Sequence, residues 1–213
     1  AAYVQSAVHA QGEDLKELAE FVQANKFARA LDLGCGGGHA SFTLAPHVGE
    51  ITAYDLSAEM LSAVAAEAAR RGFANLKTQQ GTVEKLPFAD ASFDFAVTRF
   101  SAHHWHDIRA GLREARRVLK LGAPAMFLDV FAPANPLLDT FLQTFEMLRD
   151  PSHVRDYSVA EWTNMLREAG FDPSAATERR IHIDYAQWIA RMQTPQVYAD
   201  AIRALQKDMS EDV

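Results

Sequence analysis

The segment "ALDLGCGGGHASF", residues 30–42, begins as an apolar run, reaches an acid at Asp32, and then places four glycines in five positions. The apolar run predicts a buried strand, and the segment after the glycines predicts the helix that leaves it. In open α/β sheets, ligands bind at the carboxyl ends of strands, where glycine allows close approach to the backbone and the next helix presents its positive N-terminus. The segment therefore predicts an α/β sheet with a nucleotide or nucleoside site at this loop.

The spacing of the glycines excludes two common phosphate-binding loops. A dinucleotide G-x-G-x-x-G motif would need glycine at position 39 or 41, and these positions hold His39 and Ser41. A P-loop would need Gly-Lys-Ser or Gly-Lys-Thr, which is not found there. The pattern present is D-x-G-x-G-x-G, formed by Asp32, Gly34, Gly36 and Gly38. An acid at this strand end would repel a pyrophosphate but attract the ammonium group of an amino acid.

Helical and strand patterns alternate along the rest of the chain. Residues 12–23 have the spacing of an amphipathic helix. Strands are predicted at 28–34, 51–56, 92–100 and 123–133, with weaker strands at 75–81 and 174–184. Helices are predicted between the first five strands and at 135–150, 158–171 and 185–209. Near-continuous apolar strands separated by helices are typical of a doubly wound, mostly parallel α/β sheet.

Composition sets the protein class. At 213 residues, with 48% hydrophobic residues and a net charge of −7, the chain fits one globular domain, 1–213. The acidic balance disfavours a nucleic-acid partner or an anionic membrane surface. No basic segment followed by an apolar one opens the chain, so we expect no membrane insertion. The single cysteine, Cys35, excludes an internal disulfide and predicts a reducing compartment, the cytoplasm.

Several motifs occur in one order between residues 28 and 131. They are "LDLGCGGG" (31–38), "AYDLS" (53–57), "GTVEKLPFADASFDFAV" (81–97), "RFSAHHW" (99–105) and "REARRVLKLGA" (113–123). This arrangement resembles the class I S-adenosylmethionine-dependent methyltransferases, in particular the small-molecule branch with the ubiquinone and menaquinone C-methyltransferases (methyltransferase type 11). The resemblance implies a Rossmann-like sheet of strand order 3-2-1-4-5-(7)-6. No seventh strand is visible in the sequence, so we expect the chain to end before it.

The resemblance also implies S-adenosylmethionine as cofactor, S-adenosylhomocysteine as product, and a small, partly apolar methyl acceptor. The implied cofactor residues are Asp32, Gly34, Cys35, Gly36, Gly38, Asp55, Leu56, Met60, Thr82, Val83, Glu84, Arg99 and Ser101. In the family, an acid at the place of Asp55 accepts both ribose hydroxyls, and its distance from the glycines independently suits a ribose-binding acid. Thr82 departs from the acid that the family commonly has. On its own, Cys35 is most simply interpreted as a small apolar side chain packed beside the loop.

Two histidines after the fourth strand are candidates for catalysis. His103 or His104 could act as the general base for an acidic O–H, N–H or C–H, or both could only pack and hydrogen-bond in the loop. A metal site is not expected, because adjacent histidines point apart in regular structure. The N-terminal segment 1–25 and a helical insert at 132–157 are predicted to cover the substrate. The residues expected to contact substrate or lid are Tyr3, His9 and Trp105.

Other functions share this fold. A NAD-dependent oxidoreductase would also have a ribose-binding acid, and a catalytically silent S-adenosylmethionine-binding regulatory protein would keep the pocket. "RFSAHHW" stands where nucleobase and amide methylating enzymes carry Asn/Asp-Pro-Pro-aromatic, so those acceptors are disfavoured. The sequence predicts a small-molecule substrate, and a monomer or homodimer.

Overall fold

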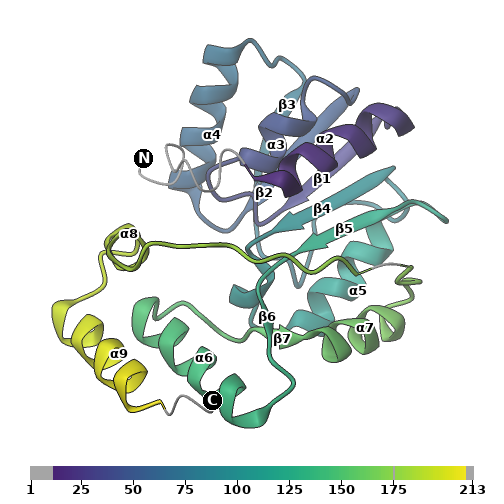
Figure 1. Cartoon of the computed structure of the whole chain (residues 1–213). Helices are drawn as coiled ribbons and strands as arrows, with labels where there is room; N and C mark the ends of the chain where they lie inside the picture. Colours follow the sequence, from purple (N-terminus) through teal and green to yellow (C-terminus); the bar gives the residue numbers. More distant parts are fainter. Residues whose placement is uncertain (1–11, 175, 210–213) are drawn as a thin grey trace. The chain divides into compact units, whose positions relative to one another are not determined.

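The computed structural model describes residues 12–174 and 176–209, which form two compact units (Figure 1). The first unit holds the described residues up to Asp129 together with Ala169–Phe171. The second holds Val130–Glu168 and the described residues from Asp172 onward. The prediction of one domain over 1–213 stays a prediction beside this division.

A five-stranded parallel sheet forms the first unit. Its strands are β1 (Arg29–Leu33), β2 (Glu50–Asp55), β3 (Leu76–Gln80), β4 (Phe95–Arg99) and β5 (Ala125–Leu128). Their order is β3-β2-β1-β4-β5, which confirms the doubly wound α/β fold class. Because β1 lies between β2 and β4, the order reverses at β1. Ligand sites in such sheets lie at the carboxyl ends of the strands on either side of this reversal.

Helices α2 (Glu13–Asn25), α3 (His39–Leu44), α4 (Ala58–Arg71) and α5 (Ile108–Val118) belong to the same unit, with a 3₁₀ turn, η1, at Ala102–His104. The Ser57 side chain caps α4 by accepting from the Met60 N–H, and Gly72 ends the helix in the left-handed conformation. Asp107 caps α5 by accepting from the Ala110 N–H. These short-range caps fix where each helix leaves the sheet.

An apolar cluster joins α2 and α3 to the central strands. The buried face of α2 consists of Leu15, Leu18 and Val22. It shares one core with Phe95 and Val97 of β4 and with residues of α3. The rings of Phe27 and Phe95 stack with centroids 4.9 Å apart. This packing places the start of α2 within reach of the carboxyl end of β4.

The second unit is mainly helical. Strands β6 (Phe131–Ala132) and β7 (Tyr157–Ser158) pair in parallel, and the helices are α6 (Pro136–Arg149), α7 (Val159–Glu168), α8 (Tyr185–Arg191) and α9 (Gln196–Asp208). Asn135 caps α6 through the N–H groups of Leu137 and Leu138, and Pro136 occupies its first turn. The segment 132–157 thus contains α6, as its helical prediction requires; its role over a substrate stays a prediction.

Three predicted elements were wrong in their bounds or type. The strand predicted at 123–133 ends at Leu128, and Phe131–Ala132 pairs with β7 instead. Residues 176–184 form no strand, because their apolar side chains are too few to bury a face: Ile181 and Ile183 are 52% and 39% exposed. The helix predicted over 185–209 is interrupted before Gln196, where Pro195 precedes α9.

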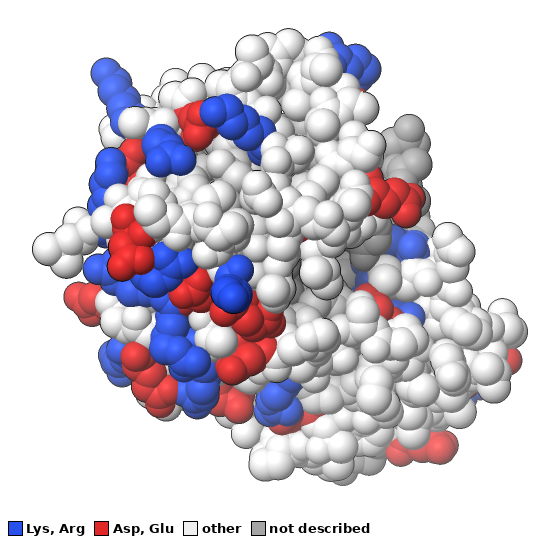
Figure 2. Space-filling view, turned by 180° about the vertical axis from the view of Figure 1, so that it is seen from behind, with Lys and Arg blue, Asp and Glu red and all other residues white. Residues whose placement is uncertain are grey.

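The surface in Figure 2 shows Lys and Arg side chains interleaved with Asp and Glu. Ion pairs also join basic and acidic side chains of the first unit: Arg117 donates to Glu114 and Asp90, and Lys120 to Asp94. The basic groups of these pairs are therefore already matched by carboxylates. Among the described helices, none has both the length and the apolar character that crossing a bilayer requires.

Truncating Leu112 on α5 tests the core. Its side chain is fully buried, so Leu112→Ala should lower the free energy of unfolding by about 2–5 kcal/mol through lost contacts and a residual cavity. The neighbouring Arg113 is exposed, and Arg113→Ala should change it by less than about 0.5 kcal/mol. Urea denaturation followed by far-UV circular dichroism measures both. Equal midpoints for the two variants would contradict the packing of α5.

Candidate functional site

The glycine loop after β1 has left-handed backbone at Gly34, Gly36 and Gly38, with φ of 67°, 50° and 79°. A Cβ atom at Gly34 would lie 1.8 Å from Ser101 Oγ, so the segment after β4 packs directly on this loop. A Cβ at Gly36 would meet nothing within 4 Å. Packing against Ser101 therefore requires glycine at position 34. At position 36 no protein atom requires it, and close approach of a ligand to the backbone would explain the glycine there.

Asp32 lies in β1 with a carboxyl group that is only half satisfied. Its Oδ2 accepts a hydrogen bond of 2.6 Å from Ser41 Oγ, while Oδ1 is buried and has no hydrogen-bond partner among the described residues. Burial raises the pKa of Asp32 to about 6, against the lowering effects of the Ser41 bond and the Arg99 charge. Buried polar atoms are normally paired, so the unpaired oxygen indicates a donor that a bound ligand would bring.

Asp55 ends β2 and is held by two backbone donors. Its Oδ2 accepts from the Gly36 N–H at 2.8 Å, and its Oδ1 accepts from the Ser57 N–H at 2.8 Å. Each carboxylate oxygen keeps a second lone pair, so the group is oriented and can still accept from two hydroxyls. The next residue, Leu56, is 67% exposed and offers an apolar side chain beside it. Met60 contributes the N–H that Ser57 caps.

The segment 82–84 is tied to its neighbours. Tyr54 donates its hydroxyl to the Thr82 carbonyl at 3.0 Å, and Val83 is buried. The Glu84 carboxylate accepts from the Thr82 hydroxyl, and also from the backbone N–H groups of His106 and Asp107 at 3.1 and 3.3 Å. Glu84 thus links the loop after β3 to the loop that leads into α5.

Arg99 ends β4 and forms an ion pair with Asp14 at the start of α2. Its guanidinium group also lies over the Phe100 ring, 4.7 Å from the centroid. Phe100 has a φ of 51°, an uncommon conformation for an aromatic residue, and its N–H donates to the Leu128 carbonyl at 2.8 Å. The chain therefore turns sharply as it leaves β4, and α2 is attached to that turn through Arg99.

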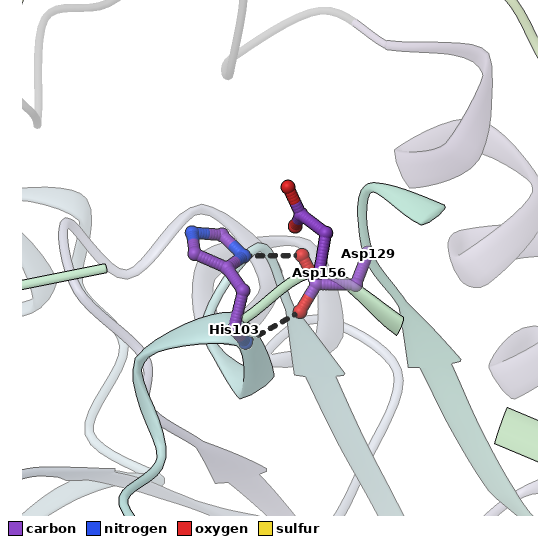
Figure 3. A group of neighbouring side chains, drawn as sticks. All are labelled: His103, Asp129 and Asp156. Atoms are coloured by element: carbon purple, nitrogen blue, oxygen red, sulfur yellow. Dashed lines mark hydrogen bonds and ion pairs between the residues drawn. The ribbon is translucent and has the colours of Figure 1, made fainter. Parts of the chain in front are cut away.

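His103 in η1 is bound to Asp129, which directly follows β5. The His103 Nδ1 lies 2.6 Å from Asp129 Oδ1, and the His103 backbone N–H donates to Asp129 Oδ2 at 3.2 Å (Figure 3). The ring of His104 contacts that of His103, with centroids 4.2 Å apart. The structure thus joins one of the two candidate bases to a carboxylate.

Two other predicted site residues are largely buried. Trp105 is 4% exposed; its ring packs on Gly111 of α5, and its Nε1 donates to Ser101 Oγ at 3.3 Å. Cys35 is 9% exposed, and burial raises the pKa of its thiol well above the usual value. The environment of Cys35 suits a packed, unreactive side chain.

Tyr3, His9 and the first eleven residues of the predicted 1–25 cap segment lie outside the described residues. The described part of that segment, residues 12–25, contains all of α2. Among the residues that were not predicted, Ser41, Asp14 and Asp129 make side-chain contacts with the predicted site residues Asp32, Arg99 and His103. Asp129 is an acid immediately after an apolar strand, which is a signal available in the sequence. The partners of the three depend on tertiary contacts.

The donors and acceptors at this edge suit S-adenosylmethionine. The unpaired oxygen of buried Asp32 suits an ammonium group, and the oriented Asp55 carboxylate suits the two hydroxyls of a ribose. The exposed Leu56 suits the apolar face of a base. A pyrophosphate would instead face two carboxylates in the same loop region.

Comparison with known proteins agrees with this chemistry. The methyltransferase domain family matches residues 31–127. The uncharacterized methyltransferase YcgJ of Bacillus subtilis is 38% identical over 193 residues, covering 91% of this chain and 76% of YcgJ. A demethylmenaquinone methyltransferase of Chlorobaculum parvum is 30% identical over 175 residues, covering 73% and 70%.

A solved structure extends the likeness to the fold. The crystal structure of YcgJ superimposes with a TM-score of 0.89 at 35% identity, covering 93% of this chain and 85% of that one. Half-satisfied Asp32, oriented Asp55 and the strand order 3-2-1-4-5 thus occur in a chain whose relatives are methyltransferases. The protein belongs to the S-adenosylmethionine-dependent methyltransferases.

Proposed function

We propose that this methyltransferase modifies a small aromatic acceptor of the quinol class, an aromatic ring with acidic O–H groups and an apolar substituent. The observation that carries the proposal is the His103–Asp129 pair, a candidate base at the carboxyl edge of the sheet. A quinol has an acidic O–H for such a base to deprotonate. The relative from Chlorobaculum parvum is named for demethylmenaquinone, a quinone whose two-electron-reduced form is such a quinol.

The contacts at the carboxyl edge of the sheet support a role in cofactor binding for the following residues. Asp32 Oδ1 receives the ammonium group of S-adenosylmethionine, and Asp55 receives its ribose hydroxyls. Gly36 lets the ligand approach the backbone, and Leu56 covers the adenine. Gly34, Gly38 and Ser101 support the loop, while Met60, Thr82, Val83 and Glu84 shape its adenine side.

The protein needs few chemical groups for this reaction. Its main contribution is to hold the acceptor in line with the methyl group, which alone lowers a barrier by several kcal/mol, roughly 7–11 in well-oriented model reactions. One base, His103 or His104, then removes the acceptor proton. A small-molecule acceptor, a cytoplasmic location and a monomeric or homodimeric state complete the proposal; the single cysteine supports a reducing compartment.

The rival readings make different demands. A NAD-dependent oxidoreductase would require a glycine spacing that this chain lacks. The relative YcgJ of this chain is named a methyltransferase. A silent S-adenosylmethionine-binding protein would keep Asp32 and Asp55 but would have no use for a base. The His103–Asp129 pair therefore favours an enzyme over a binding protein.

Ligand-induced stabilisation tests the role of Asp55. S-adenosylhomocysteine at about 100 times its dissociation constant should stabilise the protein by roughly 2.7 kcal/mol, and NADH should not. Asp55→Ala removes the ribose acceptor and should abolish most of the shift in melting temperature. Glu20→Ala, which removes an exposed acid of α2, should retain it. A full shift in Asp55→Ala would show that another group binds the ribose.

The raised pKa of Asp32 predicts a pH-dependent affinity. In the ligand-free protein Asp32 is mostly protonated below about pH 6, and an ammonium ligand binds the ionised form more strongly. Binding must then release a proton, so the affinity for S-adenosylhomocysteine should rise by up to about tenfold per pH unit as pH increases toward 6, and level off above it. Asp32→Asn should bind more weakly and lose this dependence.

Isothermal titration calorimetry between pH 5 and 7, in two buffers of different ionisation enthalpy, measures affinity and proton release together. Glu20→Ala serves again as the control and should keep the pH dependence of the wild type. A wild-type affinity that is constant across this pH range would contradict the contact between Asp32 and the ammonium group.

Transfer of a labelled methyl group identifies the acceptor class. S-adenosylmethionine carrying a tritiated methyl group should label 1,4-naphthoquinols with an apolar substituent, kept reduced under anaerobic conditions. The corresponding quinones, which lack the acidic O–H, should remain unlabelled. Duplex DNA and a denatured protein mixture serve as negative controls. Labelling of these controls in preference to the quinols would overturn the proposed acceptor.

A further inference from the structure

We propose that Asp129 is the positioning residue that selects His103 as the base and makes its Nε2 the proton-accepting atom. The inference rests on the proposed function and deepens it, since it names which of the two histidines acts and through which nitrogen. Neither the pairing of Asp129 with His103 nor a preference between the two histidines could be predicted from the sequence. Three observations carry it: the two hydrogen bonds, the strand pairing behind them, and the contact of the same loop with the glycine loop.

Asp129 holds His103 at two points. One carboxylate oxygen accepts the backbone N–H at 3.2 Å, which anchors the start of the 3₁₀ turn. The other oxygen lies 2.6 Å from the ring Nδ1, which fixes the rotation of the imidazole about its side-chain bonds. A single carboxylate thus sets both the position and the direction of the ring, as a charge-assisted pair with two contacts can.

This arrangement is built on the sheet. Strands β4 and β5 pair in parallel with Arg99 opposite Leu128, and the Phe100 N–H donates to the Leu128 carbonyl. Asp129 therefore leaves the sheet at the same level as the chain that leads to His103. A group on adjacent strand ends is held more rigidly than one on a long loop, which suits a site that must be oriented in advance.

The bond to Asp129 determines the tautomer of the ring. An ionised carboxylate only accepts hydrogen bonds, so a neutral imidazole facing it must carry its proton on Nδ1. The lone pair then lies on Nε2. Figure 3 shows the Nδ1 edge of the ring turned toward Asp129 and the other nitrogen on the opposite side. Nε2 is consequently the atom that can take up a proton.

The same loop touches the cofactor loop. Ser101, two residues before His103, is the residue that a Cβ at Gly34 would meet at 1.8 Å. Strand β4 also pairs with β1, where Val97 lies opposite Asp32. The His103–Asp129 pair and the glycine loop therefore belong to one edge of one unit, which is where a base must lie to reach an acceptor beside the cofactor.

The proton step balances as follows. His103 Nε2 forms a bond to the acceptor proton, and the electron pair of the broken O–H bond stays on the acceptor oxygen. The acceptor uses an electron pair to form the new bond to the methyl carbon. The carbon–sulfur bond breaks, and its electron pair remains on sulfur. The positive charge lost at sulfur appears on the imidazolium, beside the Asp129 carboxylate. The Asp129 carboxylate accepts from the Nδ1–H of the imidazolium and stabilises that charge.

Nitrogen-15 NMR of the histidine side chains tests the tautomer without any acceptor. At pH 8, with selectively labelled histidine and His103→Gln used for assignment, His103 should show a protonated Nδ1 and an unprotonated Nε2. Asp129→Asn, whose amide can also donate, should shift the population toward the other tautomer. A wild-type His103 protonated on Nε2 would overturn the proposal, whatever the methyl-transfer assay shows.

Kinetics test the consequence, with an alkyl-substituted 1,4-naphthoquinol as the acceptor. Asp129→Asn and His103→Gln should each lower kcat about 10²-fold or more, with KM for S-adenosylmethionine nearly unchanged, since a positioned base contributes at least this factor. Asp129→Glu keeps the carboxylate and should recover part of the loss. The acidic limb of the pH profile should move to lower pH in Asp129→Asn, because the carboxylate favours the imidazolium.

The matched control is His106→Gln, which replaces an exposed histidine of the same loop and leaves its backbone bond to Glu84 intact. It should retain wild-type kcat. Full activity in Asp129→Asn, or loss of activity in His104→Gln but not in His103→Gln, would overturn the proposal. Unchanged melting temperature and affinity for S-adenosylhomocysteine separate positioning from misfolding.

The two proposals fail in different ways. If the wild type binds S-adenosylhomocysteine but labels no quinol, the acceptor class is wrong, and the tautomer measurement still decides the role of Asp129. If quinols are labelled and Asp129→Asn is as active as the wild type, the proposed function stands and the positioning role is wrong.

Discussion

The burial of a carboxyl group in the central strand is the constraint that organises this protein. Asp32 lies in β1, between Ala53 of β2 and Val97 of β4, where water cannot stabilise its charge. Burial raises the pKa of Asp32 to about 6 even though the Ser41 hydroxyl donates to its Oδ2, so ionisation costs more here than it would in water. The free protein thus tolerates a buried carboxyl group in a central strand, and under the proposed function the ammonium group of the cofactor would offset that cost.

Much of the fold could be predicted from the sequence, because strands β1, β2 and β4 are apolar runs bounded by glycine or polar residues. The end of β5 could not. Residues 123–133 are apolar almost throughout, and only pairing with different partners separates Ala125–Leu128 from Phe131–Ala132. The local pattern also wrongly predicted a strand that includes residues 176–184, where two exposed isoleucines do not make a buried face. In both places the sequence pattern is short, and long-range contacts decide.

In the site, too, local sequence patterns predict some residues, whereas contacts between residues far apart in the sequence could not be predicted. Asp55 could be found because its distance along the chain from the glycines is characteristic, and the structure then explains its orientation through Gly36 and Ser57. Asp129 could not be paired with His103, since the two are 26 residues apart and meet only because β5 lies beside β4. Gly34 has a further reason that the sequence does not reveal: its missing side chain makes room for Ser101, a part of the protein itself.

The ion pair between Arg99 and Asp14 connects the start of α2 to the carboxyl end of β4, and the charge of Arg99 also acts on Asp32. One cation therefore serves two acids from distant parts of the chain. Removing it would leave a carboxylate without its partner at the start of α2 and would raise the cost of ionising Asp32. A substitution at position 99 would therefore act at once on the attachment of the first helix and on the charge of the buried acid in β1.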